Sequence, residues 1–239
     1  MLCAYICLFL DARFGLGTPN TYSQISIMQS MIDFLTQNGI PQYATLWILM
    51  LPIAATVVVV SRQIIGIKGF GITMPVLFGF SFASTGLEMG IMIMLIVLLS
   101  GYLIRSLLNN VRLLYLPKTA LVITGAAVTA LAVSPLLPYS KEFQFPLAAF
   151  ALVIFVLSLE QFYAFLSERG LKKTTAVTIE TLALSIIVFL ITTWELLQGL
   201  VIDHPILTIL AVVATNLFLG KWTGLRLSEY IRFKDVIFK

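Results

Sequence analysis

Residues 145–197 read FPLAAFALVIFVLSLEQFYAFLSERGLKKTTAVTIETLALSIIVFLITTWELL, which is two long apolar runs separated by a short basic gap. Each run holds roughly the 20 predominantly apolar residues that an α-helix needs to cross the hydrocarbon core of a bilayer. Neither run alternates between apolar and polar residues, so the strands of a membrane β-barrel are disfavoured. The stretch therefore predicts two antiparallel transmembrane helices joined at a basic turn.

The rest of the chain repeats this pattern. Hydrophobic residues make up 59% of the chain and charged residues 11%, with a mean hydropathy of +1.01. A soluble domain is about half apolar and about a quarter charged, so we expect an all-α, polytopic integral membrane bundle. Its seven predicted spans are residues 44–61, 70–87, 88–104, 117–137, 145–166, 174–197 and 203–220.

The positive charges predict the orientation of the bundle. Of the 15 Lys and Arg residues, all except Arg13 and Lys141 follow spans one, three, five or seven. Cytoplasmic loops are enriched in Lys and Arg, so we expect the N-terminus outside and the C-terminus in the cytoplasm. The net charge of +4 then has a topological origin, and no nucleic-acid partner is expected.

Two flanking segments complete the organisation around a transmembrane domain at residues 44–220. Residues 1–43 are expected to form an extracytoplasmic segment with a short interfacial helix, because apolar residues are spaced helically over residues 24–35. Residues 221–239 are expected to form a basic, amphipathic cytoplasmic tail. Residues 1–10 are apolar but lack the basic start of a signal peptide, so export of the N-terminus is expected to depend on a preceding part of a longer product.

Spans two and three leave two alternatives open. They abut at residues 85–88, TGLE, and form either two full crossings with a tight external turn or a re-entrant hairpin. Two crossings fit the charges better, because they keep Arg105 and Arg112 on the same side as Lys118.

The entrance to span two predicts irregular backbone. Residues 66–75 read GIKGFGITMP, in which three glycines and a proline disfavour a regular helix. Non-helical backbone at membrane depth is tolerated only against protein or a water-filled cavity. The glycines that we take as motif positions, here and near the C-terminus, are Gly66, Gly69, Gly71, Gly220 and Gly224.

The sequence contains no catalytic constellation. The only histidine, His204, lies beside Asp203 at the outer end of span seven, where a solvated interfacial role is expected. Cys3 and Cys7 are interpreted as small buried hydrophobes rather than metal ligands. We therefore expect no catalytic residue, no metal site, no cofactor and no enzymatic activity in this chain.

Two carboxylates fall inside the predicted spans, where an ionisable group costs at least about 2.5–3.5 kcal/mol unless it is paired or solvated. Glu160 lies six residues before the cytoplasmic end of span five, and Glu180 lies six residues after the start of span six. Because the two spans are antiparallel, both carboxylates are expected roughly 9 Å inside the cytoplasmic boundary. The predicted intramembrane polar layer comprises Glu160, Glu180, Gln161, Thr181 and Asn216.

Three roles are open for this layer. The acids form ion pairs with Arg105, Arg112 or Lys118 that lock the bundle, or they line a cytoplasm-facing cavity for a substrate or a partner's side chain. In the third reading they share a proton in a transport pathway, since two close carboxylates do not both ionise cheaply. Beside the layer we predict a cytoplasmic docking face made of Arg62, Lys68, Arg105, Arg112, Lys118, Arg226, Glu229 and Arg232.

Four stretches of the chain resemble one bacterial family, the seven-transmembrane-helix domain usually fused behind an inactive transglutaminase-like periplasmic domain. They are RQIIGIKGFGITMPVLFGFSF (62–82), RLLYLPKTALVIT (112–124), the Phe145-Pro146 pair and LFLGKWTGLRLSEYIRF (217–233). The last stretch is the most specific, and the similarity covers about residues 40–235.

The resemblance implies a multi-pass protein of the bacterial inner membrane. It also implies a cytoplasmic partner, an ATP-grasp enzyme similar to a glutamate ligase. The periplasmic transglutaminase-like domain is either a partner on a separate chain or absent, with only the membrane module kept. We therefore expect a non-catalytic scaffold or export subunit in the making or export of a peptide or polymer, by association rather than from a site. The alternative is a proton-coupled secondary transporter that uses Glu160 and Glu180.

Overall fold

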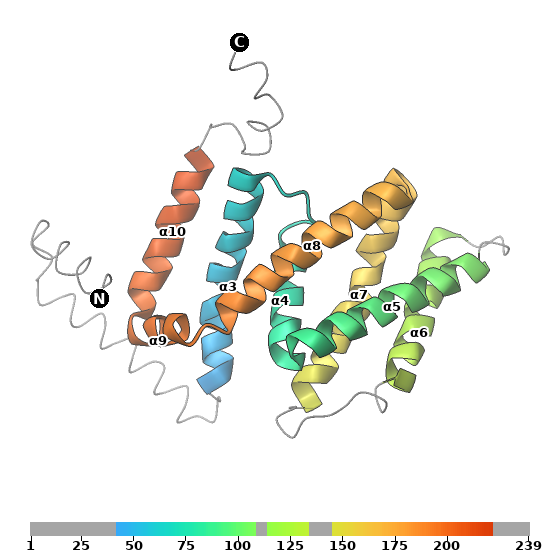
Figure 1. Cartoon of the computed structure of the whole chain (residues 1–239), viewed down its shortest axis with the longest axis horizontal. Helices are drawn as coiled ribbons and strands as arrows, with labels where there is room; N and C mark the ends of the chain where they lie inside the picture. The colour runs from blue at the N-terminus through green and yellow to red at the C-terminus, as the bar shows by residue number, and fades with distance from the viewer. Residues whose placement is uncertain (1–41, 109–113, 134–144, 222–239) are drawn as a thin grey trace, which may run out of the picture.

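The structure is a computed structural model that describes residues 42–108, 114–133 and 145–221. All regular elements in these ranges are helices (Figure 1). They are α3 (Gln42–Val60), which continues as a π-helical turn (Ser61–Ile65), α4 (Thr73–Thr85), α5 (Leu87–Leu107), α6 (Tyr115–Val133), α7 (Phe145–Arg169), α8 (Leu171–Thr192), α9 (Glu195–Asp203) and α10 (Pro205–Lys221). The predicted all-α, polytopic membrane bundle is confirmed.

Each predicted span contains a helix. Five helical stretches are long and apolar enough to cross a membrane alone: Ala44–Ile65, Leu87–Leu107, Leu116–Val133, Ala149–Arg169 and Leu171–Thr192. A sixth candidate is the pair α9 and α10, which is bent by 106°. The predicted N-terminal segment, apart from residues 42 and 43, and the tail after Lys221 lie outside the described residues.

The sixth span ends earlier than expected, at Thr192 instead of residue 197. The chain is extended at Trp194 and then forms α9, whose residue Gln198 donates a side-chain hydrogen bond of 2.7 Å to the Thr192 carbonyl. This bond satisfies one of the carbonyl groups that a helix leaves free at its end. The next helix, α10, begins at Pro205, a position where the missing N–H of proline costs nothing.

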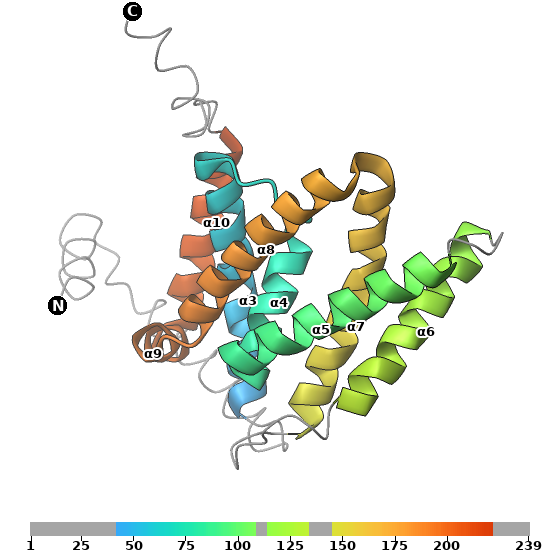
Figure 2. The same ribbon diagram turned by 45° about the vertical axis from the view of Figure 1, so that its right-hand side comes forward.

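Helix α4 lies in the middle of the bundle. Figures 1 and 2 show it behind α8, with α3 on one side and α7 on the other. It has only 13 residues and therefore rises about 20 Å, less than the roughly 30 Å of the hydrocarbon core. Residues 66–72, which precede it, are not helical.

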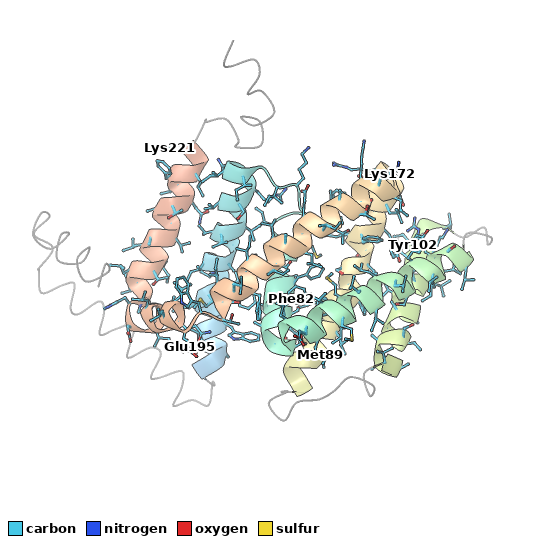
Figure 3. All side chains as sticks on the ribbon, in the orientation of Figure 1. Phe82, Met89, Tyr102, Lys172, Glu195 and Lys221 are labelled. Atoms are coloured by element: carbon cyan, nitrogen blue, oxygen red, sulfur yellow. The ribbon has the colours of Figure 1, made fainter. Side chains whose placement is uncertain are left out.

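The turn between α4 and α5 lies at Gly86, which has a φ of +83°. The start of α5, marked by Met89 in Figure 3, lies away from the end marked by Lys172 and Lys221. Residues 66–85 therefore traverse the bundle, which favours a full crossing over a re-entrant hairpin.

Small residues let the helices approach closely, as is typical of membrane proteins. A Cβ on Gly79 of α4 would lie 2.3 Å from Val188 Cγ1 of α8, and one on Gly101 of α5 would lie 2.6 Å from the Tyr163 hydroxyl of α7. Around these contacts α4, α5, α6 and α7 share an apolar core that contains Phe82. The outward faces expose large apolar side chains, as lipid contact requires.

The basic residues of the described chain gather at one end of the bundle, which we call the basic end. Figure 3 places Lys172 and Lys221 there, and Glu195 at the opposite end. The basic end comprises Arg62, Lys68, Arg105, Lys118, Arg169, Lys172, Lys173 and Lys221. This distribution agrees with the sequence pattern, in which basic residues follow every second predicted span.

Candidate functional site

The segment between the π-helical turn and α4, residues 66–72, is held in place by α8. We call it the glycine loop. The Lys68 N–H donates a hydrogen bond to the Glu180 carboxylate, and the Phe70 N–H donates one of 2.9 Å to Thr181 Oγ1. The Thr181 hydroxyl in turn donates to the Val177 carbonyl at 2.7 Å. Two consecutive residues of α8 thus replace hydrogen bonds that a helix would have supplied.

Each glycine of the loop occupies a position that disfavours a larger residue, for a different reason at each position. Gly66 has a φ of +90°, which ends the π-helical turn and which side chains with a Cβ rarely adopt. Gly69 rests on α8, where an added Cβ would lie 3.2 Å from Thr181 Oγ1 and 3.3 Å from Leu184 Cδ1. Gly71 has a φ of +60°. The loop therefore adopts a shape that is unsuited to larger residues at these positions.

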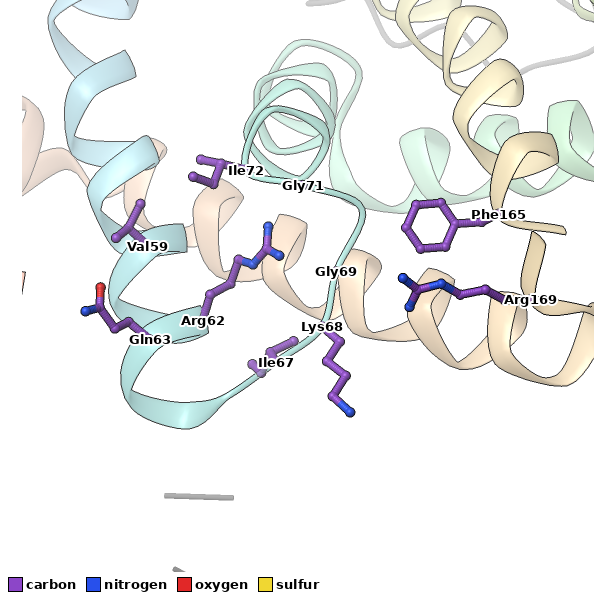
Figure 4. Close-up of a pocket in the computed structure, with 10 residues that line it drawn as sticks. All are labelled: Val59, Arg62, Gln63, Ile67, Lys68, Gly69, Gly71, Ile72, Phe165 and Arg169. Carbon is purple, nitrogen blue, oxygen red and sulfur yellow. The ribbon is translucent and has the colours of Figure 1, made fainter. Parts of the chain in front are cut away.

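A cavity of about 530 Å³ lies beside the glycine loop at the basic end. Its lining residues are Val59, Arg62, Gln63, Ile67, Lys68, Gly69, Gly71, Ile72, Phe165 and Arg169. Figure 4 shows the Arg62 and Arg169 side chains reaching toward the loop from different sides, whereas the Lys68 side chain extends away from it. The Arg169 guanidinium lies over the Phe165 ring, 5.0 Å from its centroid. The lining is thus both basic and apolar.

The residues of the predicted polar layer make separate contacts in different parts of the bundle. Glu180 and Thr181 hold the glycine loop, and Asn216 Nδ2 of α10 donates to Thr56 Oγ1 of α3 at 2.7 Å. Gln161 lines a separate narrow pocket between α4, α5, α7 and α8. Glu160 is exposed on α7.

The two carboxylates of the layer have different surroundings. Within the described ranges, Glu160 has no recorded hydrogen bond or ion pair, and no hydrogen bond joins it to Glu180. Equal depth along antiparallel helices therefore does not bring the two acids into direct contact.

Only some residues of the predicted docking face lie in the part of the chain that the structure describes. Arg62 and Lys68 line the cavity, and Lys118 lies in the first turn of α6. Arg105 donates a hydrogen bond of 2.7 Å to Ser167 Oγ, and its guanidinium lies 4.7 Å from the centroid of the Tyr163 ring. The members of the face and motif that fall outside the described residues are Arg112, Arg226, Glu229, Arg232 and Gly224. Gly220 is described, near the end of α10, where an added Cβ would meet no atom within 4 Å.

Arg169 was expected only as one of the basic residues that set the orientation, and Phe165 was not among the predicted site residues. Their spacing of four residues at the end of a predicted helix is a weak indication that the two side chains meet. Their approach to the glycine loop depends on tertiary packing. Among the described residues, no group of three or more His, Cys, Asp and Glu side chains is arranged to hold a metal ion.

Comparison with known proteins shows the family of this chain. No curated protein and no solved structure matches it. One family matches over residues 4–237, which covers nearly the whole sequence, and its description is 7 transmembrane helices usually fused to an inactive transglutaminase. The match agrees with the helical bundle and with the apolar spans described above. The chain therefore belongs to the family of seven-helix transmembrane domains usually fused to an inactive transglutaminase.

Proposed function

We propose that this multi-pass membrane protein is a non-catalytic scaffold or export subunit of the bacterial inner membrane. At its basic end it docks a cytoplasmic ATP-grasp enzyme of the glutamate-ligase type, and together they make or export a peptide or polymer. The observation that carries the proposal is the basic end, where Lys and Arg residues of the described helices gather on one face. Such a face attracts an acidic partner surface and speeds its association.

Two further observations support a subunit role. The transglutaminase to which this family is usually fused is inactive by its description, which favours assembly over catalysis for the membrane part of the complex. In addition, Lys172 and Lys173 are exposed at the turn between α7 and α8. They are therefore free to meet a partner at the membrane surface.

The test is purification of the protein from its native membrane in a mild detergent, with mass spectrometry of stoichiometric partners. We expect an ATP-grasp enzyme, or a transglutaminase-like chain, to co-purify. Two double variants, Lys172→Glu with Lys173→Glu and Arg226→Glu with Arg232→Glu, should lose the cytoplasmic partner. Glu195→Gln at the opposite end is the matched control and should keep it. Retention of the partner by both charge-reversed variants contradicts docking through the basic end and the predicted basic tail.

A second candidate is a proton-coupled secondary transporter, which the broken second span favours. Discontinuous helices beside a cavity are a recurring feature of transporter binding sites, and here the break contacts Glu180. This candidate expects substrate-dependent flux into proteoliposomes that Glu160→Gln and Glu180→Gln abolish while the fold is retained. Flux that persists in both variants, or no flux over a panel of amino acids and short peptides, argues against it.

A further inference from the structure

We propose that the cavity beside the glycine loop binds a phosphate or phosphodiester anion, supplied either by an anionic lipid headgroup or by a soluble phosphorylated ligand. The inference concerns the chain by itself and does not depend on a cytoplasmic partner. It rests on the charge of the lining, on the backbone of the loop and on the place of the cavity in the bundle.

The charge of the lining is unbalanced. Among the described residues, Arg62, Lys68 and Arg169 line the cavity and no Asp or Glu does, with the Arg62 and Arg169 side chains turned toward the loop (Figure 4). Glu180, the carboxylate that touches the loop, lies outside the lining and accepts the Lys68 N–H. Arg62 is half-buried, and neither arginine has a recorded ion pair with any residue in the described part of the chain. Because a partly buried charge is costly without a counter-charge, this arrangement favours a bound anion.

The glycine loop offers backbone donors to the same cavity. The N–H groups of Lys68 and Phe70 are used by α8. Gly69 and Gly71 both line the cavity, and within the described ranges no acceptor is recorded for their N–H groups. A glycine lets a ligand approach the backbone closely, so the backbone at Gly69 and Gly71 is accessible to an anion in the cavity.

Geometry and size favour a phosphate group over a lone carboxylate or a halide. The two guanidinium groups reach toward the loop from different sides (Figure 4), which suits an anion with several acceptor oxygens. The volume of about 530 Å³ falls within the roughly 300–1,000 Å³ of small-molecule sites. There is therefore room for the group esterified to the phosphate.

The place of the cavity also suits a phosphate at the membrane surface. It lies at the basic end, and basic pockets between transmembrane helices on the cytoplasmic side are known sites for anionic lipid headgroups. Ile72, which is 44% exposed, borders the cavity and gives it an apolar edge toward the surroundings of the bundle. An amphiphilic ligand would meet charge and apolar surface together.

The experiment measures the thermal unfolding midpoint of the purified full chain in neutral detergent. One arm adds phosphatidylglycerol, with phosphatidylcholine as its reference, and a second adds inorganic phosphate at constant ionic strength, with chloride as its reference. The test variant is Arg62→Gln with Arg169→Gln. The control is Lys172→Gln with Lys173→Gln, which removes the same charge from exposed positions of the basic end outside the lining.

We expect at least one phosphate probe to raise the midpoint of the wild type. Its apparent affinity should fall about tenfold or more in the test variant, because charge-assisted hydrogen bonds are lost. In the control it should change by less than about twofold, because exposed charges contribute little. Stabilisation by phosphatidylglycerol alone identifies a lipid headgroup, and stabilisation by inorganic phosphate that competes with the lipid identifies a soluble ligand.

Two results would overturn the inference. One is a wild type that neither probe stabilises, and the other is an equal loss of affinity in the test and control variants, which means diffuse surface attraction. If the double variant does not fold, the single variant Arg169→Gln replaces it. The described contact of the Arg169 guanidinium is the exposed one with the Phe165 ring, so this change is expected to leave the fold intact.

Discussion

Replacing Thr181 by valine tests whether α8 holds the glycine loop. Valine has nearly the shape of threonine, so the change leaves no cavity and removes only the hydroxyl. That hydroxyl accepts the Phe70 N–H at 2.9 Å. Thr181 is 0% exposed and Phe70 is 5% exposed, so water is excluded as a replacement partner. The Phe70 N–H is therefore left buried without an acceptor.

The expected magnitude follows from that orphaned donor. Leaving one buried donor unsatisfied costs about 1–3 kcal/mol. If the loop opens locally to relieve this cost, its opening equilibrium rises about 5- to 160-fold, by conversion of the same energy at room temperature. The Lys68 amide is the best reporter, because its bond to the Glu180 carboxylate is untouched by the substitution.

The assay is residue-resolved hydrogen exchange on the protein in nanodiscs. Thr174→Val is the matched control, because Thr174 is also 0% exposed on α8 and its hydroxyl makes only a local bond, to the carbonyl of the capping residue Gly170 at 2.9 Å. We expect faster exchange of the Lys68 amide in Thr181→Val and little change in Thr174→Val. Unchanged exchange in Thr181→Val, or an equal increase in both variants, would refute the reasoning.

Three other sites give predictions that denaturant unfolding in detergent can check. Gly79→Ala should cost about 1–3 kcal/mol, because the new Cβ would lie 2.3 Å from Val188 Cγ1. Adding Val188→Ala should recover part of that loss, and no recovery would contradict the contact. Asn216→Leu should cost about 0.6 kcal/mol through the lost bond to Thr56, so no effect would mean that the bond is unimportant. Tyr163→Phe should be neutral or stabilising, because the Tyr163 hydroxyl is buried and has no hydrogen-bond partner among the described residues. A loss above about 0.5 kcal/mol would contradict that environment.

The positions of the helices were largely predictable, because apolar length and alternating basic gaps constrain them strongly. The end of α8 at Thr192 was not. Residues 195–197 are apolar enough to read as the end of span six, yet they begin α9, which is bent by 106° relative to α10. Hydropathy measures how apolar a segment is and not its direction. A short helix lying across the bundle therefore looks like an extension of the preceding span.

The site was predictable only in its local features. The glycines indicated irregular backbone, and the structure shows a non-helical loop at residues 66–72, whereas Pro75 lies in the first turn of α4. The contacts of that loop with Glu180 and Thr181 join residues more than 100 positions apart. Equal depth suggested that Glu160 would lie near Glu180, but depth does not fix the rotation of a helix about its axis. Both faces of a membrane helix are apolar, so the pattern could not show that Glu160 faces outward.

The contacts at the basic end also establish how often the chain crosses the bundle. Arg62 and Arg169 line one cavity, and Arg105 donates a hydrogen bond to Ser167, two residues before Arg169. Arg62 and Arg105 therefore lie at the same end, and because the start of α5 lies away from that end (Figure 3), the chain between them runs across the bundle and back. Helix α5, which is long and apolar enough to cross a membrane, forms the return path. Residues 66–85 form the outward path, independently of any rule about charge.

The outward path did not require a loop. A continuous helix over residues 66–85 would rise about 30 Å, which matches the hydrocarbon core. Breaking the helix instead removes backbone hydrogen bonds that have to be replaced inside a membrane. Glu180 and Thr181 replace two of them, while the N–H groups of Gly69 and Gly71 have no recorded acceptor within the described ranges and belong to residues that line the basic cavity. The requirements of crossing therefore do not account for the glycine loop, and the anion site proposed above gives the loop a role.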